Sequence, residues 1–594
     1  SRFFMQLDNV EGPAADYTVD LDIHGPVVVP ADALRRTVRL EAGGKGSVII
    51  PVTAAGLGTA TFDVKLSGPG AETTQRFALR LQPGTSAVVR RMVRPLEAAS
   101  SLTVSRDLVA DILPGTGAVS VSVSPLPALD VPGLLQALDR YPYGCSEQVV
   151  SRAMPLLYVN KLAAGEHMAL DQALEERVRG AIERVLSRQD SNGAFGLWSV
   201  GGDDIWLNAY VTDFLTRARE NGFAVPQQAF SQALDRLRNF VANTTEAEGM
   251  SAEIAYAAYV LARNGRPVMG DLRYLADTKL LTFTTSLSRA QIAAALALLG
   301  DRGRAQKAFG AAVEQLRDTR DTGVSRPDYG TRLRDAAGTL ALVSEAGLSR
   351  DIVHLIAEVI EAERQPGRAT STQENVWMIL AAQALARDAE ALSLTVDGAP
   401  HKGSLYRTYR DGTLASRSIA VGNAGAATAQ VVLSVTGNPI GPEPAASQGY
   451  AIERSYYKLD GTKVEPKEVR QNDRLVTVLK VTEPQARYAR VLLVDRLPAG
   501  LEIDNPKLVD SGSVAALDWL KTDVEPANVE YRDDRFVAAF DRTVEQGAFF
   551  TAAYMVRAVA PGHYVHPPAH VEDMYRPERF GRTAFGTIDV VAKQ

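Results

Sequence analysis

One short stretch of the 594-residue chain decides how the rest is interpreted: Tyr141-Pro142-Tyr143-Gly144-Cys145-Ser146-Glu147-Gln148. It contains the only cysteine in the sequence, so Cys145 cannot form a disulfide within the chain. Gln148 follows three positions later, and a turn there would bring the sulfur within reach of the side-chain carbonyl carbon. Loss of ammonia would then close a β-cysteinyl-γ-glutamyl thioester, an electrophile stored inside the fold. The alternative is that Cys145 is a small buried hydrophobic residue, the commonest fate of a free cysteine.

Outward from this stretch, helical periodicity runs from about residue 126 to about residue 388. Apolar residues at i, i+3, i+4 and i+7 predict one buried stripe per helix, and the pattern occurs three times, at Ile254/Ala257/Ala258/Leu261, Ile292/Ala295/Leu296/Leu299 and Leu333/Ala336/Ala337/Leu340. Gly265, Gly300 and Gly347 follow as expected helix ends, because glycine accepts the left-handed conformation found there. Such helices need one another to bury their stripes, which predicts an array or closed ring of helical hairpins.

Strand patterns lie on both sides of the helical block. Before it, Tyr17, Val19, Leu21 and Ile23 alternate with polar residues, as do Val119, Val121 and Val123, and this period of two is typical of antiparallel sheets. After it come four β-rich runs, 475–481, 491–494, 536–540 and 549–559. The sequence therefore predicts a helical block set between two β segments.

Length and charge limit the class of protein. Single hydrophobic cores stop growing at roughly 250 to 300 residues, so a chain of this length should form several domains. Its 64 basic and 70 acidic residues give a formal charge of −6, too weak a field for a polyanion, and nucleic acid is not expected as a partner. With a single cysteine the chain can form no internal disulfide, so the cysteine count does not indicate whether the protein works in a reducing or an oxidising compartment.

The first residues and the apolar runs bear on membrane insertion. Ser1-Arg2-Phe3-Phe4-Met5 lacks an initiator methionine and the pattern of a signal peptide. The longest strongly apolar run, 292–299, is far shorter than the roughly 20 residues that span a bilayer. We therefore expect a soluble chain that begins inside a longer protein.

Gly144, Cys145, Glu147 and Gln148 resemble the thioester signature of the α2-macroglobulin and complement family, Gly-Cys-x-Glu-Gln. Two downstream features are similar to landmarks of that family: Asp190–Phe195 followed by Trp206–Val211, and Thr370–Asn375. The resemblance covers essentially the whole chain, but only the C-terminal part of a family member. The earlier macroglobulin domains and the protease-cleaved bait region would precede Ser1.

This resemblance implies a multidomain fold of β-sandwich macroglobulin-type domains, with a CUB-like β domain split by an all-α, α/α-toroid thioester domain. The expected ranges are a macroglobulin-type sandwich at 1–84, the first CUB-like part at 85–125, the thioester domain at 126–388, the second CUB-like part at 389–455 and a C-terminal macroglobulin-type sandwich at 456–594.

The function implied is that of a fragment of a broad-spectrum protease inhibitor, bacterial and periplasmic, with an inner-membrane anchor through a lipidated N-terminus. A lysine amine of a target protease would attack the Gln148 carbonyl and free Cys145. This is single-use covalent capture rather than enzymatic turnover, and it needs no cofactor. The expected partners are target proteases and the N-terminal macroglobulin domains of the same protein.

A thioester must be shielded from water until it is needed. Tyr141 and Tyr143 flank it and are candidates for an apolar cover. The resemblance also implies that the C-terminal domain lies against the thioester, and Met574 and Tyr575 are the candidates for that contact. A helix opening at Ser146 would stabilise the departing thiolate through its dipole.

Histidines could alter this chemistry, because hydroxyl-preferring family members use a histidine of the thioester domain. The helical block offers only His167 and His354, neither in a recognisable context, so we expect a preference for amines. His563, His566 and His570 form a weak metal-ligand pattern interrupted by Pro567 and Pro568, and no metal site is expected.

Other functions stay open at this point. Asp203 and Asp204 could suggest a glycosidase carboxylate pair, although acids at such a position more often begin a helix. Cys145 could be the nucleophile of an acyltransferase, which would need a histidine base. The chain could also be a structural or adhesive β-sandwich protein.

Overall fold

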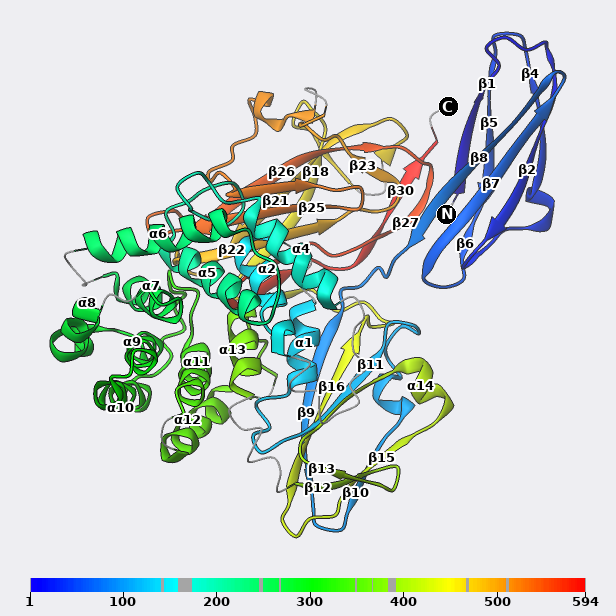
Figure 1. The fold of residues 1–594 in the computed structure, drawn as a ribbon. Helices are drawn as coiled ribbons and strands as arrows, with labels where there is room; N and C mark the ends of the chain where they lie inside the picture. The colour runs from blue at the N-terminus through cyan, green and yellow to red at the C-terminus, as the bar shows by residue number, and fades with distance from the viewer. Residues whose placement is uncertain are drawn as a thin grey trace.

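The computed structural model describes residues 2–139, 144–158, 174–244, 249–266, 269–347, 350–365, 367–382, 392–465, 469–508 and 512–592. Figure 1 shows four parts: an N-terminal β sandwich that stands apart, a β domain below it, a helical domain, and a C-terminal β sandwich that lies against the helices. In the described part of the chain, no helix is long and apolar enough to cross a membrane.

The N-terminal part is an antiparallel sandwich. β1 (Arg2–Asp8) pairs with β5 (Lys45–Pro51), and the larger sheet has the order β4 (Arg35–Leu40), β2 (Ala15–His24), β7 (Gly58–Gly68), β8 (Ala71–Leu81). A short pair, β3 (Val27–Val28) and β6 (Thr53–Ala54), completes it. The predicted alternation along β2 is confirmed, because Tyr17, Val19 and Leu21 are buried while their neighbours are not.

The second part is assembled from both sides of the helical block. One sheet has the order β10 (Ser101–Val104), β15 (Ile419–Asn423), β12 (Ser393–Val396), β13 (Ala399–Lys402), and the other the order β14 (Leu405–Arg410), β11 (Ala118–Val123), β16 (Ala429–Gly437), β9 (Val88–Leu96). A short helix, α14 (Asp411–Ser416), follows β14. Since β11 lies between two strands that follow the helices, the helical block is an insertion into this β domain.

The helical domain is a closed ring. Its described helices are α1 (Val131–Asp139), α2 (Ser146–Ala153), α4 (Leu174–Leu186), α5 (Ile205–Glu220), α6 (Gln227–Asn243), α7 (Ser251–Arg263), α8 (Met269–Tyr274), α9 (Ser286–Leu298), α10 (Arg302–Asp318), α11 (Arg332–Glu345), α12 (Arg350–Glu363) and α13 (Thr372–Ala382). α2, α5, α7, α9, α11 and α13 pack in succession, and α13 packs back on α2. The predicted ends are confirmed at Gly265, Gly300 and Gly347, with φ values of 65°, 83° and 62°.

The C-terminal sandwich has one sheet in the order β17 (Ala446–Gln448), β29 (Arg576–Arg582), β28 (His570–Asp573), β22 (Ala489–Arg496), β25 (Arg535–Arg542), β24 (Asn528–Tyr531). The second has the order β19 (Lys463–Val464), β18 (Ala451–Tyr457), β21 (Arg474–Thr482), β26 (Phe549–Ala558), β23 (Leu501–Ile503). A third comprises β20 (Val469–Arg470), β30 (Gly586–Val591) and β27 (Gly562–His566).

The expected boundary between 455 and 456 needs correction. It falls inside β18, which pairs with β21, and β17 already pairs with β29. Backbone hydrogen bonds therefore assign residues 446–457 to the C-terminal sandwich rather than to the split domain. β17 is three residues long without a buried side chain, so no alternation marked it in the sequence.

One sheet of the C-terminal sandwich is buried on both faces. In β22, Val491 and Leu493 join the core of the sandwich, whereas Leu492 and Val494 join the core of the helical domain. β25 repeats this division, with Val537 and Ala539 in the helical core. Because successive strand side chains point to opposite faces, a continuous apolar run is what a strand between two cores requires. The sandwich and the helices thus share a packed interface.

Candidate functional site

The Cys145–Gln148 stretch forms the first turn of α2. Cys145 is the N-cap residue, with φ −64° and ψ 159°, and its Sγ accepts a hydrogen bond of 3.5 Å from the backbone N–H of Gln148. All four residues from 145 to 148 are buried. The Oε1 atom of Gln148 is buried without a hydrogen-bond donor. The turn therefore places the thiol and the glutamine of the predicted pair together in a site closed to water.

The environment of Cys145 keeps the thiol protonated. Burial raises the pKa of Cys145 above its ordinary value, the negative charge of Glu147 raises it further, and the positive charges of Arg188 and Arg490 oppose this only in part. A cysteine nucleophile needs a lowered pKa. None of the histidines in the described ranges is hydrogen-bonded to Cys145 as the base of an acyltransferase would be.

Arg188 holds the turn at residues 144–146 through hydrogen bonds. Its guanidinium donates to the Gly144 carbonyl at 2.6 Å, to the Ser146 hydroxyl at 3.1 Å and to the Leu197 carbonyl at 3.2 Å. Ser146 in turn donates its backbone N–H to the Leu197 carbonyl at 2.8 Å and its hydroxyl to Gly196. Gly196 and Leu197 directly follow residues 190–195, the first of the two family-like features. They therefore connect that loop to the start of α2.

That loop is itself tied to α5. Gly193 has a φ of +83°, and a Cβ there would lie 2.4 Å from the Gln232 carbonyl oxygen, so the turn requires glycine. The N–H of Phe195 donates to Asn208 Oδ1 at 2.7 Å. The second half of the landmark therefore holds the first half in place.

Glu147 is the centre of a buried hydrogen-bond network. Its carboxylate accepts from the Ser151 hydroxyl on its own helix, and from Thr372 at 3.0 Å and Gln373 Nε2 at 2.8 Å on α13. A fourth donor is the Tyr575 hydroxyl, at 2.8 Å, from the C-terminal sandwich. A buried carboxylate is stable when donors surround it in this way, and the donors here come from three separate parts of the chain.

Met574 and Tyr575 form the turn between β28 and β29, and their exposed fractions are 2% and 4%. Both pack into the core of the helical domain that also contains Cys145. The Tyr575 N–H donates to Asp573 Oδ1 at 3.0 Å, and Asp573 accepts from the Ser325 hydroxyl at 2.7 Å. Tyr575 thus reaches the site through its hydrogen bond to Glu147, and Met574 precedes it in the same buried turn. Tyr141 and Tyr143 lie outside the described residues.

Two residues of the site had no signal in the sequence. Tyr329 is buried, its ring meets the Tyr575 ring edge-on at a centroid distance of 4.9 Å, and the Arg490 guanidinium lies 3.8 Å from its ring centroid. Arg490 is the second residue of β22, and its local sequence predicts only a strand. The Asp328-Tyr329-Gly330 sequence indicates only a turn, so both roles depend on tertiary contacts.

Asp203 and Asp204 have different partners. Asp204 caps α5 by accepting from the Leu207 N–H at 2.9 Å, and it also accepts from the Tyr329 hydroxyl and from Arg490. Asp203 is exposed and pairs with Arg236. Asp204 is therefore the N-cap of α5, as expected for an acid at a helix start, and Asp203 belongs to a surface ion pair.

The histidines are dispersed. His354 is exposed on α12, and His167 lies outside the described residues. His563 contacts Asp589, His566 contacts Tyr456, and His570 contacts Glu572. Each member of the His-rich run therefore has its own partner.

The β sandwiches, the split β domain and the inserted helical ring define a multidomain macroglobulin-type fold. Residues 449–578 match the family described as bacterial alpha-2-macroglobulin MG10 domain, and residues 119–260 match the A-macroglobulin TED domain family. The first match covers the Met574–Tyr575 turn, and the second covers Cys145–Gln148.

Related proteins extend the likeness to the whole chain. The chain is 30% identical to alpha-2-macroglobulin of Xylella fastidiosa (strain 9a5c), over 100% of its own length and 38% of the relative's. It is 28% identical to alpha-2-macroglobulin of Escherichia coli (strain K12), over 97% of its length and 36% of the relative's. It therefore spans less than half of the curated relatives that it matches.

Solved structures agree. The native E. coli alpha-2-macroglobulin from domain MG7 to the C-terminus superposes with a TM-score of 0.86 at 27% identity, covering 100% of this chain and 96% of that one. Salmonella alpha-2-macroglobulin reacted with methylamine gives a TM-score of 0.83 at 29% identity, covering 100% of this chain and 40% of that one. The chain is thus an α2-macroglobulin-like protein that corresponds to the C-terminal part of its bacterial relatives.

Proposed function

We propose that this chain is the covalent-capture part of a protease inhibitor, and that Cys145 and Gln148 form an internal thioester. The observation that carries the proposal is the buried turn in which Gln148 N–H meets Cys145 Sγ while Gln148 Oε1 has no donor. An unpaired buried amide oxygen costs free energy. Closing the thioester links the sulfur to the carbonyl carbon and expels the amide nitrogen, with the thiol proton, as ammonia. The carbonyl oxygen stays in place, but as part of a thioester it is a weaker hydrogen-bond acceptor, so its lack of a donor costs less.

The capture step is an acyl transfer. A lysine amine of an attacking protease adds to the Gln148 carbonyl carbon, the carbon–sulfur bond breaks, and an amide forms. The proton released by the amine ends on the Cys145 sulfur, which becomes a thiol. Each molecule reacts once, so the chain is an inhibitor and not a catalyst.

Shielding is supplied by the C-terminal sandwich. Met574 and Tyr575 pack from a separate domain into the core that contains Cys145, so on this side water is kept from the thioester while that domain stays in place. The Tyr575–Glu147 hydrogen bond belongs to this cover. Tyr141 and Tyr143 stay candidates for the remaining side. The cover explains how an electrophile persists in water.

The nucleophile and the setting are part of the same proposal. Amines are preferred to hydroxyls, since no histidine in the described ranges is bonded to Cys145. The target is a protease cut off from its substrates after it becomes attached, and the N-terminal macroglobulin domains supply the trigger. The periplasmic location and the lipidated anchor stay predictions.

A fluorescent primary amine tests the capture chemistry directly. The chain is incubated with dansylcadaverine and digested, and the labelled peptide is sequenced by mass spectrometry. The proposal expects label on residue 148 and one new thiol at Cys145 per label. Cys145→Ala and Gln148→Ala are the matched controls and should take up no label. Label spread over other residues, or equal labelling of Cys145→Ala, would contradict the proposal.

A further inference from the structure

The loop between α10 and α11, residues 319–330, is a docking loop for the C-terminal sandwich. Five of its residues contact that sandwich: Asp321 pairs with Arg576, the Val324 carbonyl with Arg576, Ser325 with Asp573, the Pro327 carbonyl with Arg490, and Tyr329 with both Arg490 and Tyr575. The turn at residues 573–576, which covers Cys145 and Gln148, therefore packs on this loop. We call the loop residues that contact the sandwich, together with Arg490, the seat of that turn.

Tyr329 is the aromatic part of this seat. Its φ is +58°, a left-handed conformation that costs free energy for a bulky residue and persists only where surrounding contacts enforce it. The ring lies against Trp206 at 5.1 Å and Tyr575 at 4.9 Å, and its hydroxyl donates to the Asp204 cap of α5. The Arg490 guanidinium closes the remaining face. Tyr329 thus fixes where the Tyr575 ring can sit.

An ion pair forms the charged part of the seat. Arg576 donates two hydrogen bonds to Asp321, at 2.8 Å and 2.6 Å, and the exposed fractions of the two side chains are 4% and 20%. Such a two-point, largely desolvated pair is directional and stronger than an exposed pair. Separation of the two domains would have to break it.

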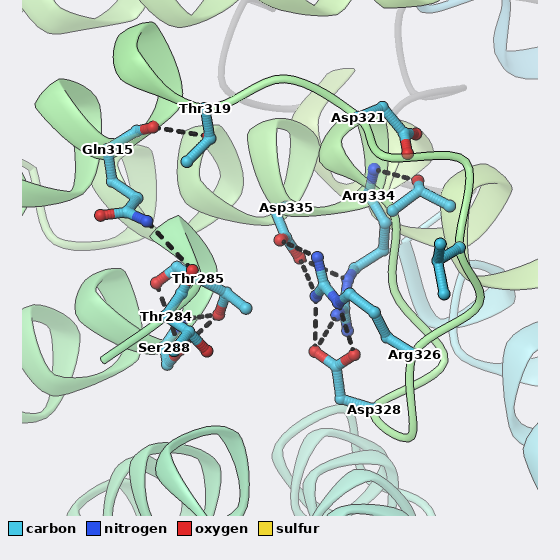
Figure 2. A network of polar contacts seen from close by, with 12 residues as sticks. Thr284, Thr285, Ser288, Gln315, Thr319, Asp321, Arg326, Asp328, Arg334 and Asp335 are labelled. Carbon is cyan, nitrogen blue, oxygen red and sulfur yellow. Dashed lines mark hydrogen bonds and ion pairs between the residues drawn. The ribbon is translucent and has the colours of Figure 1, made fainter. Parts of the chain in front are cut away.

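The base of the docking loop, residues 326–330, is bonded to the helical domain, whereas its tip, residues 319–325, is bonded to the sandwich. Arg326 binds Asp328 and Asp335, and Arg334 binds Asp328, which fastens the base of the loop to α11 (Figure 2). Asp321 lies apart from this cluster on the same loop. A cavity of about 330 Å³ lies behind the tip, between residues 319–322 and the starts of α7 and α9. The tip is therefore held by Arg576 and Asp573 rather than by a packed core.

We infer that the docking loop controls how fast the Cys145–Gln148 pair becomes accessible, with Tyr329 and Arg490 as positioning residues for Tyr575 and the Asp321–Arg576 pair as the charged latch. The inference rests on the proposed thioester. It adds the device that keeps the site closed: loss of any part of the seat leaves the thioester chemistry unchanged but raises the fraction of molecules in which Tyr575 has left the site.

The rate of thiol release by methylamine tests this device. Tyr329→Leu and Arg490→Met should release the Cys145 thiol about tenfold faster than the parent chain, since each removes one buried partner of the seat. Tyr329→Phe and Arg490→Lys keep the ring and the charge and should lie in between. The melting temperature of each variant separates this effect from a general loss of stability. Variants that release the thiol faster should still melt close to the parent chain.

A charge exchange isolates the latch. Asp321→Arg and Arg576→Asp should each speed thiol release, and the double variant should recover part of the parent's slow rate. Asp277→Asn breaks an exposed Asp–Arg pair elsewhere in the helical domain and should leave the rate unchanged. Unchanged rates in the Tyr329, Arg490 and Asp321 variants, with the thioester intact, would overturn the inference.

Hydrogen exchange makes the result independent of the thioester. In a Cys145→Ala background, where no thioester forms, residues 573–576 should exchange faster when Tyr329→Leu is added and stay protected when Asp277→Asn is added. A parent chain that never releases a thiol would refute the proposed function. Equal exchange in both double variants would refute the docking loop.

Discussion

The Tyr575 hydroxyl donates a 2.8 Å hydrogen bond to Glu147 Oε2, although the two residues are 428 positions apart in the chain. Glu147 lies between the members of the Cys145–Gln148 pair, and Tyr575 lies in the turn that covers them. The same carboxylate accepts from Thr372 and Gln373. One buried group therefore joins the start of the helical ring, its end and the C-terminal sandwich, so that departure of the sandwich changes the site itself.

Tyr575→Phe should weaken the cover without removing it. The ring keeps its place against Tyr329, but Glu147 loses one buried donor, which costs about 1 kcal/mol. Methylamine should then release the Cys145 thiol about fivefold faster than in the parent chain, as measured by thiol titration. Tyr457→Phe, which changes a tyrosine packed on Trp519 within the sandwich, should have no effect. An unchanged rate in Tyr575→Phe would show that the hydrogen bond plays no part in the cover.

Glu147→Gln should destabilise the helical domain. The new amide group brings a donor into a site where Thr372, Gln373 and Tyr575 already donate, so at least one buried polar group loses its partner. We expect a loss of about 1 to 3 kcal/mol in the free energy of unfolding, measured by urea denaturation. Glu175→Gln removes an exposed carboxylate from α4 and should stay within about 0.5 kcal/mol of the parent. Equal stability of the two variants would contradict the central role of Glu147.

Asp328→Asn tests the cluster that fastens the docking loop. Arg334 has no exposed side-chain surface and pairs with Asp328 at 2.6 Å, so the substitution leaves a buried guanidinium short of counter-charge. The expected loss is about 3 to 5 kcal/mol, measured by denaturant unfolding. The double variant Asp328→Asn/Arg334→Met should lose less than Asp328→Asn alone. A larger loss in the double variant would mean that the cluster does not act through charge.

The sequence predicted the elements whose residues carry a local signal. The stripes on α7, α9 and α11 are regular, and glycines stand where each helix stops, so periodicity sufficed. The run Val491–Val494 predicted a strand but not its two cores, because an apolar run alone does not say what lies on each face. β17 was missed and the domain boundary placed too late, since three residues without a buried side chain carry no pattern.

The candidate site divided in the same way. Cys145, Glu147 and Gln148 were found through a motif that is contiguous in the chain. Tyr329 and Arg490 were missed because their role depends on partners on other elements: Asp204 for both, and Tyr575 for the Tyr329 ring. The local sequence predicts only a turn at Tyr329 and a strand at Arg490. The packing of the sandwich on the helices brings these two residues together.

The pH response of Cys145 provides a further test in Gln148→Ala, which cannot form a thioester. Burial, followed by the charge of Glu147, raises the pKa of the thiol above its ordinary value of 9.0. The thiol of the unfolded chain therefore loses its proton at a lower pH than the thiol of the folded chain. The stability due to the protonated thiol is complete below the ordinary pKa and is lost as the pH rises from that value toward the raised pKa of the folded state. Iodoacetamide should alkylate Cys145 slowly from about pH 7 to about pH 10.

The matched measurement adds Tyr329→Leu to Gln148→Ala. Opening the site should bring the midpoint of alkylation back toward the ordinary cysteine value, and the loss of stability at alkaline pH should shrink. Rapid alkylation of Gln148→Ala at neutral pH would contradict the closed site that the structure describes.

The most direct test of the account is the intact mass of the freshly folded chain, taken together with thiol titration before and after methylamine. We predict a native mass short of the sequence mass by one ammonia, no reactive thiol at the start, and one thiol at Cys145 with one methylamine on Gln148 afterwards. A native mass equal to the sequence mass, with no methylamine taken up on Gln148, would contradict the thioester and with it the proposed function.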